Sequence, residues 1–413
     1  MARSDKRSPR VGRTLVTALT RGVSSHVHPS EGEVVRPSDP LQSQGIALRP
    51  RHRALLRAVL IGVLVLGMLL LLTVPALAGF GQYVTYATGP NPYSVRVADF
   101  NHDLAPDLAV AVGSKPAMWI LLNNGDGTFA AAVPYSVNGK GWSLAVADFN
   151  HDGRPDVAVG TTSNRVSVRF GRSGGGFDPK VSYSMDSYAN SLVAADLNGD
   201  GAPDLVGPTS VLMNQGDGTF GTAIPFGGSL SNPVDPEVRD LNKDGKLDLA
   251  AAELGSGQLA ILLGNGDGTF GVPVHYPVGP FPDAVTFGRF DSDRKVDVAV
   301  KSEPDQISVL RGNGDGTFGS ANTYTVPASQ GTLITRDVNG DNFLDLISTD
   351  VGGDGSVSVL LGNGDGTFGA VESYPVASYP RSVAAADFNN DGLVDLAVAS
   401  QQASAVSVLL GTP

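Results

Sequence analysis

Aspartate and asparagine side chains recur along most of the chain in nine-residue loops of the pattern D-x-N-x-D-G-x-x-D, such as Asp148 to Asp156. Each loop has carboxylates at positions 1, 5 and 9, an amide oxygen at position 3 and a backbone carbonyl at position 7. Calcium takes roughly six to eight such oxygens, and three carboxylates within one short loop repel one another unless a cation is present. The loops therefore predict calcium sites, and the alternative is a set of Asx-turns that only cap strands.

Six loops keep the full pattern, which predicts up to six structural Ca²⁺ ions. The predicted side-chain ligands are Asp99, Asn101, Asp103, Asp107, Asp148, Asn150, Asp152, Asp156, Asp196, Asn198, Asp200, Asp204, Asp240, Asn242, Asp244, Asp248, Asp337, Asn339, Asp341, Asp345, Asp387, Asn389, Asp391 and Asp395. Position 6, where the chain turns sharply, is Gly in four loops, Leu104 in the first and Asn342 in the sixth. Asn tolerates a left-handed backbone better than Leu, so we expect the first site to be the weakest.

One further loop departs from the pattern. Arg289 occupies its position 1 and Arg294 its position 6, beside Asp291, Asp293 and Asp297. A guanidinium can supply the positive charge that the remaining carboxylates need. The sequence therefore predicts no calcium in this loop.

The loops belong to a longer repeat. Their first positions follow one another at steps of 44 to 50 residues, and a second motif, N-G-D-G-T-F, recurs once in most repeats. Asn-Gly and Asp-Gly are hairpin-turn residues, so we expect the aspartates of this motif, such as Asp126, to form turns rather than bind metal. An aromatic residue follows each motif Phe six positions later, which predicts that the two rings lie on one side of a strand.

The two ends of the repeated region complete each other. The last repeat stops after Val406–Gly411 without its final Phe…Tyr strand, and Phe80 and Tyr86 supply such a strand at the beginning. Four short strands in each repeat of this length are typical of propeller blades. We predict an all-β fold, a seven-bladed β-propeller spanning Gly79–Pro413 and closed by pairing of its N- and C-terminal strands, with an open solenoid as the alternative.

These loops and hairpins resemble the FG-GAP/VCBS-type repeats and, through them, the N-terminal β-propeller of integrin alpha chains. The resemblance covers Gly79–Pro413. It implies a seven-bladed propeller with structural calcium in the Asp-rich loops of one face and partners on the other. The Arg289 loop departs from the family pattern, and no leg domain follows, so a role in cell adhesion does not transfer directly.

The segment before the repeats predicts export. Residues 1–53 are polar, basic and aperiodic, which predicts a disordered cytoplasmic segment. Residues 54–78 contain an apolar run preceded by arginines, which predicts a hydrophobic helix with its N-terminus in the cytoplasm. Ala76-Leu77-Ala78 resembles a signal-peptidase site. The chain is then either a single-pass membrane protein or is secreted after cleavage at Ala78–Gly79; a start codon assigned too far upstream would also explain the long leader.

Composition excludes several functions. The 413 residues include no Cys, which removes disulfides, thiolate chemistry and Cys-based zinc sites. A pI near 4.9 argues against nucleic-acid binding. No Ser/His/Asp arrangement, His-rich metal spacing or phosphate loop is present, and no catalytic residue is assigned.

The ligand site is expected on the face opposite the calcium loops, where the loops that enter each first strand differ between repeats. The candidate ligand-face residues are Tyr93, Trp142, Tyr188, Phe281, Tyr379 and Arg381. Aromatic rings and an Arg suit a protein or glycan ligand. The sequence thus predicts an exported, non-enzymatic binding or adhesion module. A calcium-dependent polysaccharide lyase or glycosidase and a structural envelope protein are the alternatives, and an axial cluster of Lys, Arg and carboxylates would favour the enzyme.

Overall fold

The computed structural model of the protein describes residues 79–327, 330–352 and 355–413. The predicted basic segment 1–53 and the predicted hydrophobic helix within 54–78 lie outside these residues. In the described part of the chain, no helix is long and apolar enough to span a membrane.

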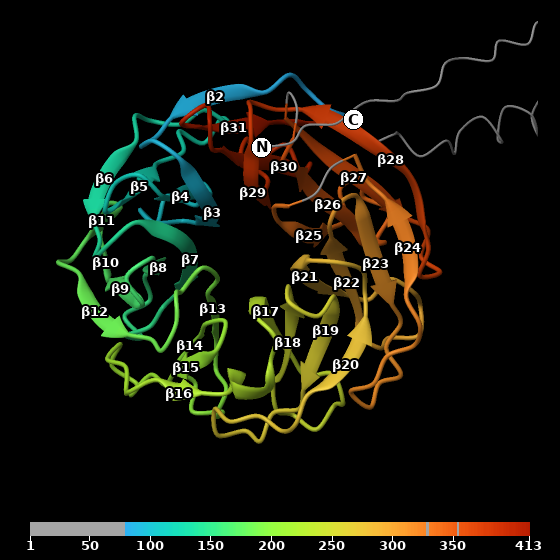
Figure 1. The fold of residues 1–413 in the computed structure, drawn as a ribbon. Coiled ribbons are helices and arrows are strands. Elements are labelled where there is room, and N and C mark those ends of the chain that lie inside the picture. The colour runs from blue at the N-terminus through green and yellow to red at the C-terminus, as the bar shows by residue number, and fades with distance from the viewer. Residues whose placement is uncertain (1–78, 328–329, 353–354) are drawn as a thin grey trace, which may run out of the picture. The chain divides into compact units, whose positions relative to one another are not determined.

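Seven four-stranded antiparallel sheets follow one another around a ring (Figure 1). We number them as blades 1 to 7. In chain order they are β3 (Pro92–Ala98), β4 (Asp107–Val112), β5 (Ala117–Leu121) and β6 (Val133–Ser136); β7 (Gly141–Ala147), β8 (Asp156–Thr161), β9 (Arg165–Arg169) and β12 (Val181–Ser184); β13 (Val193–Ala195), β14 (Asp204–Val206), β15 (Ser210–Leu212) and β16 (Ile224–Pro225); β17 (Pro233–Arg239), β18 (Asp248–Glu253), β19 (Gln258–Leu262) and β20 (Val274–Pro277); β21 (Pro282–Gly288), β22 (Asp297–Ser302), β23 (Gln306–Leu310) and β24 (Asn322–Thr325); β25 (Leu333–Arg336), β26 (Asp345–Asp350), β27 (Ser356–Gly362) and β28 (Phe368–Pro375); and β29 (Pro380–Ala386), β30 (Asp395–Ser400), β31 (Ala405–Leu409) and β2 (Val84–Ala87).

Smaller elements lie between these strands. They are the strand pairs β1 (Gly79–Phe80) with β32 (Gly411–Thr412) and β10 (Gly171–Arg172) with β11 (Gly176–Phe177), and a 3-10 helix, η1 (Gly227–Ser229).

The core lies between neighbouring blades and is built of small apolar side chains. All residues of the second strands β4, β8 and β30 are buried, and after an initial Asp each strand has at least three consecutive Val, Ala or Leu residues. Such runs are typical of strands covered on both faces. One core cluster joins Val95 and Leu108 of blade 1 to Ala397 and Val406 of blade 7. Each blade is therefore stabilised by burial against its two neighbours rather than alone.

The ring closes as predicted. β2 pairs antiparallel with β31, with Val84 opposite Val408, and β1 pairs with β32, with Phe80 opposite Gly411. Blade 7 thus takes three strands from the end of the chain and its outermost strand from the beginning, as Figure 1 shows. This pairing leaves no unpaired gap between the first and last blades and excludes the open solenoid.

The repeated aromatic residues form a belt that joins consecutive blades. The sequence predicted only that the two rings of a repeat lie on one side of a strand. In the structure, each ring of an outermost strand also meets the repeated Phe of the next blade edge to face. The seven pairs are Tyr86–Phe129, Tyr135–Phe177, Tyr183–Phe220, Phe226–Phe270, Tyr276–Phe318, Tyr324–Phe368 and Tyr374–Phe80. Their ring centroids are between 5.1 and 5.7 Å apart, the spacing of favourable T-shaped pairs. The last of them joins blade 6 to the N-terminal strand and so belongs to the closure.

Candidate functional site

The Asp-rich loops connect the first and second strands of each blade, and their oxygens converge on one backbone amide. In the loop between β7 and β8, the N–H of Asp152 donates to Oδ1 of Asp148 and to Oδ1 of Asn150, both at 3.1 Å. The N–H of Gly153 donates to Oδ2 of Asp148 at 2.8 Å. The oxygens of positions 1 and 3 therefore converge on the amide of position 5, and the side chain of position 5 accepts a hydrogen bond from Nδ2 of Asn150.

The other loops repeat this arrangement. The amide of position 5 bonds to the oxygens of positions 1 and 3 in the loops that begin at Asp99, Asp196, Asp337 and Asp387. In the fourth loop the N–H of Lys243, at position 4, donates to Oδ1 of Asp240 instead. Leu104 and Asn342 adopt φ angles of 72° and 70°, so the first loop has the same backbone as the sixth despite its Leu.

The aspartate at position 9 has a different place from the others. Asp156 is fully buried, and its Oδ2 accepts the N–H of Phe149 at 2.9 Å while its Oδ1 accepts the N–H of Gly171 at 2.7 Å. It thus ties the start of its loop to the chain after the third strand. Burial, with a smaller contribution from the carboxylates of Asp152 and Asp148, raises the pKa of Asp156 to about 6, although the two N–H bonds lower it in part. The same two bonds recur at Asp107, Asp204, Asp248, Asp297, Asp345 and Asp395.

The donor set of each loop suits a hard divalent cation. Each loop offers carboxylate and amide oxygens at positions 1, 3 and 5, and each bonded oxygen of position 9 keeps a second lone pair. In the described part of the chain, however, no three Asp, Glu or His side chains are gathered closely enough to hold a metal as they stand, because the carboxylates bond to backbone amides. The loops are therefore compatible with calcium without being arranged around an ion.

The fifth loop carries its own positive charges. Nζ of Lys295 lies 3.1 Å from Oδ2 of Asp293, and a guanidinium nitrogen of Arg311 lies 3.8 Å from Oδ2 of Asp291. The predicted guanidinium is thus provided by Arg311, which follows β23, and not by Arg289 or Arg294. Arg311 also donates to the backbone carbonyl of Asp365 in blade 6.

The aspartates of the N-G-D-G-T-F motif form turns. Oδ1 of Asp126 accepts both the N–H and the hydroxyl of Thr128, at 3.0 and 2.5 Å. These two bonds lower the pKa of Asp126. The same pair of bonds recurs at Asp217, Asp267, Asp315 and Asp365. The carboxylate oxygen therefore accepts hydrogen bonds within the turn.

A cavity of about 290 Å³ lies at the axis, at the ends of the first strands opposite the Asp-rich loops. One repeat position, six residues before loop position 1, lines it in every blade and differs each time. In blade order this position is Tyr93, Trp142, Asn190, Val234, Asp283, Gly331 and Arg381. The cavity is thus formed by equivalent backbone positions with different side chains.

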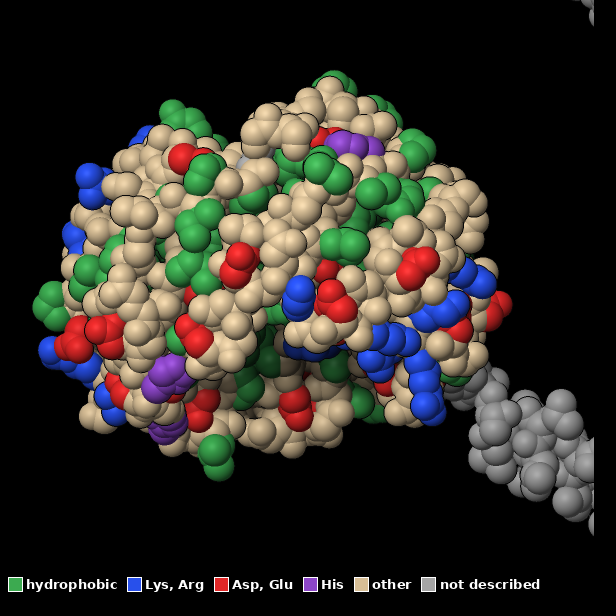
Figure 2. All heavy atoms as spheres, turned by 90° about the horizontal axis from the view of Figure 1, so that it is seen from below, with side chains coloured by type: hydrophobic (Ala, Val, Ile, Leu, Met, Phe, Trp, Pro, Cys, Tyr) green, Lys and Arg blue, Asp and Glu red, His purple; other side chains and the backbone are tan. Residues whose placement is uncertain are grey.

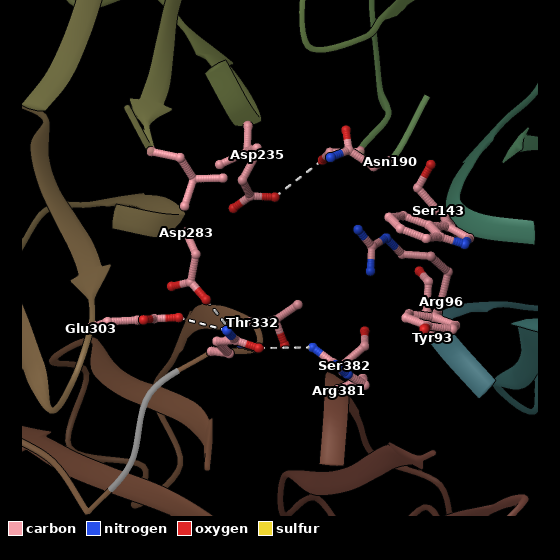
Figure 3. Close-up of a pocket in the computed structure, with 17 residues that line it drawn as sticks. Tyr93, Arg96, Ser143, Asn190, Asp235, Asp283, Glu303, Thr332, Arg381 and Ser382 are labelled. Atoms are coloured by element: carbon pink, nitrogen blue, oxygen red, sulfur yellow. Dashed lines mark hydrogen bonds between the residues drawn. The ribbon is translucent and has the colours of Figure 1, made fainter. Parts of the chain in front are cut away.

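Aromatic and basic side chains form one wall of the cavity. The rings of Tyr93 and Trp142 are stacked, with centroids 5.3 Å apart and planes 10° from parallel. The guanidinium of Arg381 lies over Tyr93 at 5.5 Å and over Tyr379 at 5.1 Å, distances typical of cation–π contacts. Its Nε also donates to Oε1 of Gln401 at 2.8 Å. Blades 7, 1 and 2 therefore contribute a continuous wall (Figure 3).

Carboxylates form the opposite wall, as Figure 3 shows. Asp235 accepts the hydroxyl of Ser191 at 3.1 Å and the N–H of Val285 at 2.8 Å, which links blades 3, 4 and 5. Asp283 accepts the N–H of Gly331 at 3.2 Å. Burial raises the pKa of Asp283 to about 7; Lys301 lowers it in part, and Asp235 raises it.

Two charged residues at one further repeat position face the axis from opposite sides of the ring. They are Arg96 on β3 and Glu237 on β17, each three residues before loop position 1. Burial raises the pKa of Glu237 to about 8, Asp235 adds to the effect, and Arg96 and Arg239 oppose it. Solvent still reaches part of this side chain, so the energetic penalty of ionising it is smaller than full burial would impose.

We expect the substitution Glu237→Gln to stabilise the propeller at alkaline pH. Between pH 4.5 and about 8 the unfolded chain releases a proton that the folded protein keeps, so this carboxyl lowers stability as pH rises. The variant should be on the order of 1–3 kcal/mol more stable than the parent at pH 8 and equal to it near pH 4.5. Urea unfolding at both pH values measures the difference, and an equal effect at the two pH values would contradict the assignment.

The remaining ligand-face candidates lie around the cavity. Tyr188 lines a second cavity of about 250 Å³ that shares Trp142 and Asn190 with the axial one. Phe281 and Tyr379 have φ angles of 46° and 64°. The left-handed region is costly for aromatic residues, so both adopt their backbone conformation against a local preference. Tyr379 contacts Arg381 of the axial cavity, whereas Phe281 lines neither cavity. Tyr93, Trp142 and Arg381 line the axial cavity itself.

Sequence reasoning missed Arg96, Asp235 and Glu237. All three lie at fixed offsets before loop position 1. Comparing those offsets across the repeats would have shown charges at positions where the other blades have uncharged residues.

Comparison with known proteins gives the fold and the family. No curated protein matches the sequence. Among solved structures, BBS1N from its complex with ARL6DN aligns with a TM-score of 0.57 at 13% identity, over 80% of this chain and 97% of that one. A putative 6-phosphogluconolactonase from Bacteroides fragilis aligns with a TM-score of 0.56 at 17% identity, over 74% and 90%. Sqt1 of Saccharomyces cerevisiae aligns with a TM-score of 0.54 at 13% identity, over 81% and 99%. At these identities the likeness concerns the fold alone.

The model of the FG-GAP-like repeat matches residues 99–159, 148–207, 240–300, 289–348 and 337–398, each match running from one Asp-rich loop through the next. The matches together cover more than half of the chain, in register with the blades. The chain therefore belongs to the FG-GAP-like repeat family and forms a seven-bladed β-propeller.

Proposed function

We propose that the protein is an exported, calcium-stabilised binding module whose ligand, a protein or a glycan, occupies the axial cavity and its aromatic rim. The proposal rests on one observation, which is that the two ends of the first strands differ in how much the repeats vary. At one end the repeats keep the same Asp-rich loop, and at the other end one position carries seven different side chains around a cavity. A uniform end suits a scaffold, and a varied concave end with convergent aromatic and charged groups suits recognition.

Calcium would belong to the scaffold. The side chains of positions 1, 3 and 5 of the six complete loops would hold it, and position 9 would contribute its remaining lone pairs. A divalent cation there would neutralise the carboxylates of each loop and fix the connection between the first two strands. The fifth loop would need no ion, since Lys295 and Arg311 already accompany its carboxylates.

Export would place the propeller outside the cytoplasmic membrane. The support for this proposal is the arginine-flanked apolar run before residue 79. Retention on the membrane through residues 54–78 and release after Ala78 are both compatible with it.

A calcium-dependent polysaccharide lyase or glycosidase is the second candidate. The observations that favour it are a carboxyl with a pKa near 7, Asp283, in the cavity, and Arg96 and Arg381 facing it. A carboxyl with such a pKa can exchange protons near neutral pH. The binding role is preferred because Asp235 and Asp283 both accept backbone N–H groups of the next blade, and thus already act as links between blades.

The test is a retention assay with the full chain, purified in mild detergent with calcium and immobilised, against a panel of polysaccharides and surface proteins. We expect one class of polymer to be retained without release of smaller products. Trp142→Ala should lower retention about tenfold or more, since an aromatic residue at the centre of an interface commonly contributes about 2 kcal/mol or more.

The control is Tyr83→Ala, because Tyr83 and Trp142 are equally exposed, at 38 and 37%, and Tyr83 lies away from the axis at the start of the outer edge of blade 7. Its retention should match that of the parent. Release of smaller products would instead establish the enzyme. Equal loss of retention in both variants would show that retention does not depend specifically on the cavity.

A further inference from the structure

The axial cavity is polarised. Asp235, Asp283 and Glu303 line it from blades 4 and 5, and Arg96 and Arg381 line it from blades 1 and 7. Figure 3 shows the carboxylates of Asp235 and Asp283 on the side opposite Arg96 and Tyr93. Positive and negative groups therefore face each other across the same cavity.

These opposite charges do not meet. Arg96 donates to the carbonyl of Val95 at 3.0 Å, and Arg381 donates to the amide oxygens of Gln401 and Gln330 at 2.8 and 3.3 Å. Within the described residues, neither guanidinium forms an ion pair with a carboxylate of the cavity. Burial raises the pKa of Asp235, while the N–H of Val285 and the more distant guanidinium of Arg96 lower it in part. Arg96 is thus near enough to act on Asp235 electrostatically, with the cavity between them.

The backbone at Asp235 has an unfavourable conformation. Its φ angle is 45°, and the register of β17 against β18 shifts between Val234 and Glu237. Non-glycine residues in this region cost on the order of 1 kcal/mol or more and concentrate at functional sites, and bulges redirect side chains. Four of the other blades have Ser at this repeat position, as in Ser94 and Ser382. At this repeat position, a carboxylate is therefore particular to blade 4.

We infer that the axial cavity binds a zwitterionic group of the kind that a free α-amino acid carries, with its ammonium against Asp235 and Asp283 and its carboxylate against Arg96. An ammonium has three donors for carboxylate oxygens, and a guanidinium binds a carboxylate through two parallel hydrogen bonds. A purely cationic ligand would leave Arg96 unpaired beside it, and a purely anionic ligand would face the acidic wall. The volume of about 290 Å³ suits one residue-sized unit, with the Tyr93–Trp142 stack beside its apolar part.

This inference rests on the proposed role of the cavity as a binding site, and it is tested with small molecules rather than polymers. The twenty standard α-amino acids are titrated singly, by calorimetry, into the full chain in mild detergent with calcium. For each amino acid that binds, its N-acetyl derivative and its methyl ester are titrated as well. We expect each derivative to bind about tenfold or more weakly, because each loses one charge-assisted pairing.

Two variants test the basic wall and the acidic wall of the cavity separately. Arg96→Gln should weaken the parent amino acid about tenfold and leave the affinity of its methyl ester unchanged. Asp235→Asn should weaken the parent amino acid and leave the N-acetyl derivative unchanged. The controls are Arg165→Gln and Asp305→Asn, which change exposed side chains outside the cavity and should have no effect. Among the residues that the structure describes, the side chain of Arg96 forms a single hydrogen bond, to the carbonyl of Val95, so its replacement tests the inference even if Asp235→Asn fails to fold.

The outcomes are distinguishable from those of the retention assay. Polymer retention that depends on Trp142, with no amino acid bound, overturns the zwitterion and leaves the binding module intact. The inference is also overturned if the methyl ester binds as tightly as the parent amino acid and Arg96→Gln leaves the affinity for that amino acid unchanged. Failure of both assays removes the proposed function together with the inference.

Discussion

Replacing Asp156 with alanine is expected to destabilise the propeller by about 2–6 kcal/mol. The side chain is fully buried, and its two oxygens accept the N–H groups of Phe149 and Gly171. The alanine variant leaves both amides buried without a partner, and each such group costs about 1–3 kcal/mol. Urea unfolding in the presence of EDTA measures this loss independently of any bound metal.

The matched control is Asp152→Ala in the same loop. Asp152 is exposed, so in EDTA its replacement should cost less than about 1 kcal/mol. Asp156→Asn should be intermediate, because its amide keeps only one accepting oxygen for the two N–H groups. A loss below 1 kcal/mol for Asp156→Ala would show that the position-9 aspartates are not the structural ties that their hydrogen bonds indicate.

Calcium is expected to be the largest single contribution to stability outside the core. Extracellular calcium modules have dissociation constants on the order of 10⁻⁴–10⁻³ M. A tenfold excess of free calcium over the dissociation constant adds about 1.4 kcal/mol at each site that only the folded state binds. Six equal sites would then add about 8 kcal/mol, and EDTA would remove it. Urea unfolding across a series of free calcium concentrations, with magnesium as the comparison, measures the effect.

The fifth loop provides an internal control for this prediction. Asp152 and Asp293 both occupy position 5 of their loops, and each pairs with the basic residue at position 7, Arg154 or Lys295, but the fifth loop has Arg289 in place of the aspartate at position 1. Calcium at tenfold excess should stabilise the Asp152→Ala variant by about 1.4 kcal/mol less than it stabilises the parent, because one site is lost. Asp293→Ala should leave the dependence unchanged. If stability does not respond to calcium and elemental analysis finds no metal, the loops are strand caps only.

Repetition made the fold predictable from the sequence. The Asp-rich loop and the N-G-D-G-T-F hairpin mark each blade, and the missing Phe…Tyr strand at the end identified Phe80 and Tyr86 as its replacement. Local periodicity could not show that each Tyr meets the Phe of the following blade, as Tyr86 meets Phe129. That contact depends on how neighbouring sheets pack, and packing between blades leaves no separate signal within one strand.

The candidate site was predictable only in its outline. Variation between the repeats before each first strand identified Tyr93, Trp142 and Arg381, although the structure places all three within the strands β3, β7 and β29 rather than in loops. Asp235 escaped notice because its direction depends on a bulge and a positive φ angle, which no residue pattern reported. Arg311 escaped for a similar reason: it lies outside the nine-residue loop whose Asp291 it accompanies, and only the fold brings them together.

The closure of blade 7 has a consequence for how the protein is made. β2 is synthesised before every other strand of its blade, and its partner β31 is among the last. Contacts between the two ends of a chain form slowly, because a very long loop must close first. A nascent chain therefore carries β2 as an unpaired edge until the seventh blade exists, and the export proposed above would require the ring to close on the far side of the membrane. Chaperones that shield strand edges would act during that interval, and the finished ring would no longer need them.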